Sequence, residues 1–481
     1  MKIDFTRFRL GTTTAAMTTY VVLAGLQRGL SLLLLPFFTK ALSPSEYGAA
    51  SILTVTSAVL LTFSATPLVS LIIRSTARKT DESPALIRLI GIYFYFIVPI
   101  FFVCIAAVFT FFVHNLFGVS GNIWSIEILS LGFLPALSVF GLFLAQAQEQ
   151  IRRFATLSIF SVSVSLIFKI LFVVVLEKGV LGWALADLAG ASIAFVLAIF
   201  LVRLPKAQIR MSHLRYAIKF TIPLIPHNAS LWALMSISRP TLASVSSLEQ
   251  VGLLSIGLNF AQFAGMILME TNRAALVRFS RETFPAPTHE TYHVVKWQVL
   301  AALLVPTTVG CGIAVLGQRI VAESYWPSLA LSGVLLVGNA AYGMYLIPMN
   351  YLTQTAGQTK YSVFASFSGA CVLFVSLILV GSVFGSTGAA YATSGSYLVM
   401  AGTALIITMR RKLDIRWILW KKNLPEISLA IGALACISVA LATAGNQGSS
   451  YILVCSSAIL AVSSVSLTIK RPTPKSLCNH A

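Results

Sequence analysis

Long apolar segments recur along almost the whole chain, and they limit the possible folds more than any other feature of the sequence. Runs of about 20 apolar residues are long enough to cross the hydrocarbon core of a bilayer as α-helices. The composition agrees, because 57% of the 481 residues are hydrophobic and 10% are charged, whereas soluble domains carry roughly 25% charged residues. The sequence therefore predicts an all-α polytopic membrane protein.

The apolar pattern predicts about 14 transmembrane helices. The expected spans are 14–38, 47–73, 88–113, 125–147, 155–177, 180–202, 216–238, 250–270, 294–316, 328–352, 361–383, 387–409, 427–444 and 451–469.

Lysine and arginine, which concentrate in cytoplasmic loops, set the expected orientation. With the N-terminus in the cytoplasm, 28 of the 34 basic residues fall in cytoplasmic segments, and four fall in outer loops: Lys40, Lys178, Arg239 and Arg319. This distribution accounts for the net charge of +19 without nucleic acid as a partner. We expect a multi-pass protein with both termini in the cytoplasm.

No motif for covalent chemistry stands out. The six cysteines show neither metal nor disulfide spacing, and the sequence contains no nucleotide-binding loop or candidate catalytic triad. The outer loops are short, whereas a membrane-embedded polymerase needs a sizeable outer domain. We therefore expect no enzyme activity, no metal and no cofactor, apart from a possible coupling proton or sodium ion.

Two halves of the chain match at offsets of 204 to 207 residues, which indicates an internal repeat. LSPSEYGAASI (42–52) aligns with SSLEQVGLLSI (246–256), IVPIFFVC (97–104) with LVPTTVGC (304–311), and GVLGWALA (179–186) with GSTGAAYA (385–392). The predicted domains are two six-helix bundles, 1–205 and 206–410, related by a parallel repeat. Residues 411–481 add a basic interfacial helix, a hairpin of two spans and a cytoplasmic tail. The substrate site of such a repeat lies near the bilayer midplane.

The LSPSEYG turn, FTIPLIPHNASLWALMSISR (220–239) and the Gly-rich openings of the sixth and twelfth spans resemble bacterial polysaccharide flippases. These belong to the multidrug/oligosaccharidyl-lipid/polysaccharide exporter superfamily. The resemblance implies a plasma (inner) membrane flippase for undecaprenyl-diphosphate-linked oligosaccharide, working by alternating access in polysaccharide biosynthesis. Glycosyltransferases and a polysaccharide polymerase are the partners it implies.

Gln27 and Arg28 lie near the middle of the first span, where a charged residue is costly and suggests function. Arg28 shares a small, polar helix face with Ala24, Gly25 and Ser31, so it is expected to point into the bundle. It could tie helices together through backbone carbonyls, or bind an anion. The resemblance implies a lipid diphosphate as that anion.

Lys169 and Asp187 flank the turn between the fifth and sixth spans, nine residues on either side of Lys178. Adjacent antiparallel helices therefore place them at the same depth. They could form a neutralising ion pair, or Asp187 could be a proton or sodium coupling site. Asp187 is the one deep carboxylate expected in the spans.

Polar residues of the second half are further candidates for substrate binding. Asn259 and Gln262 are one helical turn apart and could contact sugar hydroxyls or a neighbouring helix. His227 could bind substrate or be a hydrogen-bonded core residue. Pro223 and Pro226 could form a gating hinge or a fixed kink.

Two other functions are compatible with parts of the pattern. A drug/cation antiporter of the same superfamily needs buried carboxylates, and Arg28 would repel its substrate. An integral-membrane glycosyltransferase or polymerase is disfavoured by the short outer loops.

Overall fold

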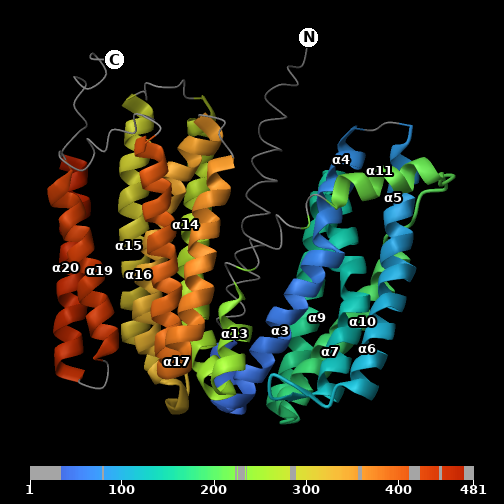
Figure 1. Cartoon of the computed structure of the whole chain (residues 1–481), viewed down its shortest axis with the longest axis horizontal. Helices are drawn as coiled ribbons and strands as arrows, with labels where there is room; N and C mark the ends of the chain where they lie inside the picture. The colour runs from blue at the N-terminus through green and yellow to red at the C-terminus, as the bar shows by residue number, and fades with distance from the viewer. Residues whose placement is uncertain are drawn as a thin grey trace. The chain divides into compact units, whose positions relative to one another are not determined.

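The computed structural model describes residues 34–78, 81–222, 225, 233, 236–281, 289–355, 360–410, 423–443 and 447–470. These are the described residues below. The chain divides into two compact units, Met1–Ser236 and Ile237–Ala481. Both consist almost entirely of helices (Figure 1).

The first unit contains long helices and a short β-hairpin. Its helices are α2 (Leu35–Ala41), α3 (Pro44–Ser64), α4 (Thr66–Arg78), α5 (Ser83–Ile92), α6 (Val98–Phe112), α7 (Gly121–Pro135), α8 (Leu142–Ala147), α9 (Ile151–Lys169), α10 (Gly179–Leu201) and α11 (Met211–Thr221). The π-helical segments η1 (Tyr93–Ile97), η2 (Ala136–Gly141) and η3 (Ile170–Val175) continue α5, α7 and α9. Strands β1 (Asn115–Leu116) and β2 (Val119–Ser120) pair antiparallel between α6 and α7.

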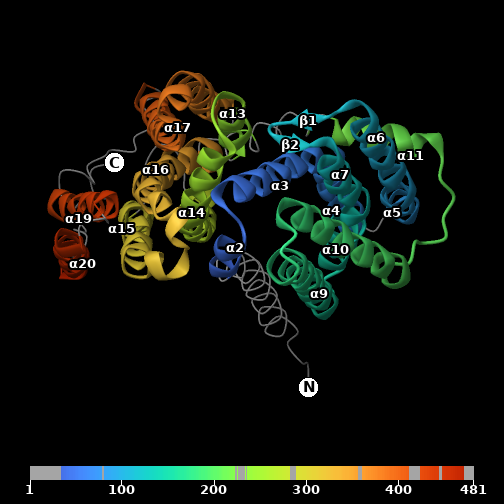
Figure 2. The same ribbon diagram turned by 90° about the horizontal axis from the view of Figure 1, so that it is seen from below.

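The second unit is helical throughout its described part. Its elements are α13 (Ser238–Val245), α14 (Leu248–Arg281), α15 (His289–Ile320), the 3-10 turn η4 (Glu323–Tyr325), α16 (Pro327–Asn350), the π-helical segment η5 (Tyr351–Thr355), α17 (Lys360–Arg410), α19 (Leu424–Ala442) and α20 (Gln447–Lys470). The hairpin α19–α20 packs against α15, and the three helices lie side by side in Figure 2.

Eleven helical segments of the described residues are long and apolar enough to cross a membrane, which agrees with a multi-pass membrane protein. One of them, Val363–Arg410, covers two expected spans, because Gly385 interrupts α17 with φ 56° and ψ −132°. The expected span 14–38 falls largely outside the described residues, and about half of 216–238 does so too. The total of 14 therefore stays a prediction.

Helix α10 shows how the spans pack. Apart from Trp183, its buried positions are small, among them Gly182, Ala186, Gly190 and Ala194, whereas large side chains such as Phe200 face outward. Small residues let helix backbones approach closely, and large apolar residues are at no disadvantage in lipid. The same pattern places Phe111 and Phe112 of α6 on the outer surface. This distribution is typical of a bundle solvated by lipid.

The predicted repeat appears as one contact that occurs in both units. Gly179 and Gly385, aligned by the repeat, both have φ +56°. A Cβ atom at Gly179 would lie 2.6 Å from Glu46 Oε1, and one at Gly385 would lie 2.6 Å from Gln250 Oε1. Glu46 and Gln250 are themselves aligned by the repeat. The two halves therefore share a backbone turn and the polar residue that contacts it.

Candidate functional site

Lys169 and Asp187 meet inside the first unit. Lys169 ends α9 and Asp187 lies two turns into α10, and the two helices pack against each other. Lys169 Nζ lies 3.1 Å from Asp187 Oδ1, and the two side chains are 15% and 21% exposed. The structure thus places the two residues at the same depth, as a largely buried ion pair.

Trp183 covers the ammonium group of this pair. Lys169 Nζ lies 3.9 Å from the centroid of the Trp183 ring, which is a cation–π contact. Phe38 and Tyr47 pack edge-on against the same ring, with centroid distances of 5.3 Å and 6.3 Å. Aromatic residues from α2 and α3 therefore hold Trp183 against Lys169 and restrict the movement of the ammonium group.

Glu127 adds a second buried carboxylate, which the sequence analysis missed. It lies on α7, which packs against α10, and is 3% exposed. Ser57 Oγ of α3 donates a hydrogen bond of 2.6 Å to Glu127 Oε1, while Oε2 is buried without a partner among the described residues. Glu127 also interacts electrostatically with Asp187 and Lys169. The expectation that Asp187 is the one deep carboxylate is therefore wrong.

A sequence signal for Glu127 existed. The residue lies two positions inside the expected span 125–147, and a carboxylate within a span suggests function. Its nearness to the end of the span made it resemble an interfacial charge.

The four residues Ser57, Glu127, Lys169 and Asp187, which we call the charged cluster, join helices α3, α7, α9 and α10. Lys169 balances one carboxylate, so a second ionised carboxylate leaves one negative charge. Because charges in a low-dielectric interior need compensation, the cluster has the charge to bind one proton or one monovalent cation. No group of three or more His, Cys, Asp or Glu side chains placed to hold a metal ion occurs among the described residues.

In the second unit, the two predicted substrate contacts on α14 are uncharged amide side chains. Asn259 of α14 is half-buried and Gln262 is exposed. Further along α14, Asn272 Oδ1 accepts hydrogen bonds from Gln298 Nε2 of α15 (3.1 Å) and Asn350 Nδ2 of α16 (2.6 Å). These amides connect three helices, whereas Asn259 and Gln262 stay predicted substrate contacts.

Other predicted site residues lie outside the described residues: Gln27, Arg28, Pro223, Pro226 and His227. Their roles stay predictions. Two charges counted as loop residues are instead buried. Arg239 is 6% exposed and its Nε donates to Ser255 Oγ at 3.2 Å, and Lys296 is 4% exposed within α15. Both lie within a helical turn or two of a helix end, where the sequence alone does not separate loop from core.

Comparison with solved structures shows which known folds this one is similar to. It is similar to that of the lipid II flippase MurJ in its inward closed conformation, with a TM-score of 0.67, 13% identity, and coverage of 95% of this chain and 98% of that one. It is also similar to the eukaryotic MATE transporter AtDTX14, with a TM-score of 0.53, 16% identity, and coverage of 85% and 98%. Identities this low show a common fold.

Comparison with curated proteins gives no match. The sequence profile described as "Polysaccharide biosynthesis protein" matches residues 38–322, which is more than half of the chain. The chain therefore belongs to the polysaccharide biosynthesis protein family and shares its fold with MurJ and the MATE transporters.

Proposed function

We propose that this protein is a flippase that moves undecaprenyl-diphosphate-linked oligosaccharide from the inner to the outer leaflet of a bacterial inner membrane. The observation that carries the proposal is that the chain belongs to the polysaccharide biosynthesis protein family and has a fold similar to that of a lipid II flippase. The two repeated units alternate access to a site near the midplane, and no covalent step is needed. Polysaccharide polymerase and glycosyltransferases are the partners in this proposal, and both termini are cytoplasmic.

In this proposal the charged cluster couples flipping to an ion gradient. Glu127 and Asp187 share one positively charged side chain, Lys169, so one proton or sodium ion neutralises the remaining charge. Ion binding at Asp187 weakens its hold on Lys169, whose charge Glu127 then balances, and the helices α7, α9 and α10 that carry these groups can then shift. The cluster thus links ion occupancy to the arrangement of the first unit.

The substrate contact in this proposal is Arg28, with Gln27, His227, Asn259 and Gln262 as further polar contacts. A guanidinium group is always charged and binds phosphate oxygens in pairs, so it suits a lipid diphosphate. Pro223 and Pro226 serve as the hinge.

The test uses a bacterial strain that carries this gene and makes a surface polysaccharide. Arg28→Ala should leave the membrane protein level unchanged, abolish surface polymer and cause lipid-linked precursor to accumulate inside the cell. Arg28→Lys should restore transport in part, because ammonium keeps the charge without the two-pronged contact. Normal surface polymer in a gene deletion strain would contradict the flippase function itself.

A drug/cation antiporter is the second candidate, and Glu127 favours it. A cationic substrate needs buried carboxylates, and the described residues of the first unit include two, Glu127 and Asp187. Deletion of the gene separates the two functions. Loss of surface polymer with unchanged drug tolerance supports the flippase, whereas drug sensitivity with normal polymer supports the antiporter.

A further inference from the structure

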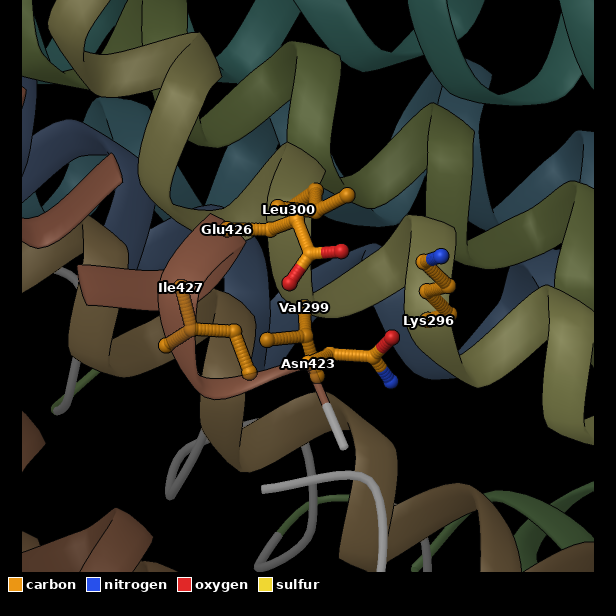
Figure 3. A pocket seen from close by; sticks show the side chains of 6 residues that line it. All are labelled: Lys296, Val299, Leu300, Asn423, Glu426 and Ile427. Atoms are coloured by element: carbon orange, nitrogen blue, oxygen red, sulfur yellow. The ribbon is translucent and has the colours of Figure 1, made fainter. Parts of the chain in front are cut away.

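A small cavity lies inside the second unit, between α15 and the first turn of α19 (Figure 3). Its volume is about 10 Å³, and it is lined by Lys296, Val299, Leu300, Asn423, Glu426 and Ile427. A cavity of roughly 10–15 Å³ holds one water molecule if two to four polar groups border it. The size of the cavity therefore matches a single small ligand.

The carboxylate of Glu426, which lines this cavity, lacks a hydrogen-bond donor among the described residues. Its side chain is fully buried at 0% exposure, and neither carboxylate oxygen has a hydrogen-bond partner among the described residues. In Figure 3 the carboxylate points into the space that Lys296 and Asn423 border. Because buried polar groups are almost always hydrogen-bonded, two unpartnered carboxylate oxygens indicate a missing donor.

Lys296 provides the opposite charge. It is 4% exposed, and its Nζ donates to the Thr468 carbonyl oxygen of α20 at 3.5 Å. An ammonium group has three donors, so it can form hydrogen bonds in several directions at once. Glu426 also lies in the first turn of α19, where the helix dipole favours a negative charge. The two charges balance each other, so the ligand that fits between them is neutral.

We propose that this cavity binds one water molecule that bridges Glu426 to Lys296 and Asn423. The water donates to a Glu426 oxygen and accepts from the Lys296 ammonium group or the Asn423 amide. A sodium ion is disfavoured, because it would leave an uncompensated positive charge beside Lys296. The ligand is therefore water, and the result is a water-mediated ion pair in an apolar interior.

This bridge connects the C-terminal hairpin to the repeated bundle. Around it, Ile427 and Ala430 of α19 pack in one apolar cluster with Val299 and Leu300 of α15. Apolar contacts between helices tolerate small shifts, whereas a polar bridge has one geometry and so sets the register. Lys296 joins α15 to α20 and, through the water, to α19. The bridge makes the hairpin a fixed part of the second unit, whatever the protein transports.

The test measures the melting temperature of the full-length protein in lipid nanodiscs. Lys296→Met should lower Tm strongly, because it leaves the carboxylate of Glu426 without its counter-charge. Glu426→Gln should lower it less. The double variant Lys296→Met/Glu426→Gln should recover most of the loss, since it removes both charges. Arg319→Met and Glu323→Gln, which change exposed charges of the same unit, are controls and should leave Tm unchanged.

Additive losses in the double variant would overturn the bridge. The identity of the ligand is tested by melting the wild-type protein in sodium, potassium and choline chloride at equal ionic strength. Water predicts the same Tm in all three salts. A sodium-specific increase that Glu426→Gln abolishes would overturn the water in favour of a cation. A high-resolution map should show one density peak between Glu426, Lys296 and Asn423, and an empty cavity would contradict the proposal.

Discussion

The two units share a turn at a glycine with positive φ, but they differ in the charge that lies beside this turn. Gly179 and Gly385 have the same positive φ, and a Cβ atom added at either would collide with the polar side chain that the repeat aligns, Glu46 or Gln250. Eight residues beyond each glycine, the first unit has Asp187 in an ion pair, whereas the second has Thr393. Thr393 Oγ1 donates to the carbonyl oxygen of Ala389 in its own helix, at 2.8 Å.

This difference indicates that the turn has a structural role and that the charge beside it has a separate one. The turn is a requirement of the fold, so both copies keep it. The second copy of the turn lacks the charge, so the turn does not require it, and its presence beside the first copy suggests a function there. Trp183, which covers Lys169, aligns with Ala389 in the second unit, so the aromatic residue is also found only beside the turn that has the ion pair.

The largest expected effect comes from breaking the ion pair. Lys169→Ala leaves Asp187 and Glu127 without a counter-charge, and loss of one partner of a buried pair costs about 3–5 kcal/mol. The solvent exposure of the pair places the cost toward the lower end of this range. Membrane protein level and Tm measure the loss.

The double variant Lys169→Ala/Asp187→Ala should be more stable than Lys169→Ala alone, because it removes a stranded charge. Equal stability of the single and double variants would show that the pair is not coupled, and the contrast with Thr393 would lose its meaning.

The glycine turns provide a matched test of the repeat. Gly179→Ala and Gly385→Ala should each lower stability by about 1–3 kcal/mol, because both positions have positive φ. The added Cβ atom also approaches Glu46 or Gln250 within 2.6 Å. Thermal unfolding of each variant measures the cost. Gly312→Ala, where an added Cβ meets nothing within 4 Å, is the control. A cost at either turn no larger than that of this control would contradict the shared role.

The sequence aligned Gly179 with Gly385 and predicted that Lys169 and Asp187 lie at the same depth, in both cases for a physical reason. A repeat aligns residues that meet the same backbone requirement, and a charge in an apolar run needs a partner, which the helical hairpin supplies at equal distance from the turn. Glu127 was harder to predict, because its partners Ser57 and Lys169 lie 70 and 42 residues away in the chain. Glu426 and Lys296 also lay at the edges of expected spans, where apolar runs do not define burial.

A smaller effect is expected from the aromatic cover of Lys169. Trp183→Phe keeps an aromatic ring but weakens the cation–π contact, and such contacts contribute about 0.5–2 kcal/mol. The change also removes the buried indole N–H, which has no partner among the described residues. The net loss should therefore be at the low end, about 0.5 kcal/mol. Trp297→Phe in the second unit, where the tryptophan is 47% exposed, is the control.

A Trp183→Phe variant as unstable as Lys169→Ala would show that Trp183 supports the core rather than the charge. In that case the aromatic support would not distinguish the two units.

The central claim is that the charged cluster couples transport to an ion gradient, and Glu127→Gln tests it most directly. Glutamine keeps an oxygen that accepts from Ser57 but cannot carry the negative charge, so the protein should fold normally. The measurement is flipping of lipid-linked oligosaccharide in proteoliposomes, with and without an imposed proton or sodium gradient. We predict that the gradient accelerates the wild-type protein and leaves Glu127→Gln at its gradient-free rate. A Glu127→Gln protein that responds to the gradient as fully as the wild type would contradict the account.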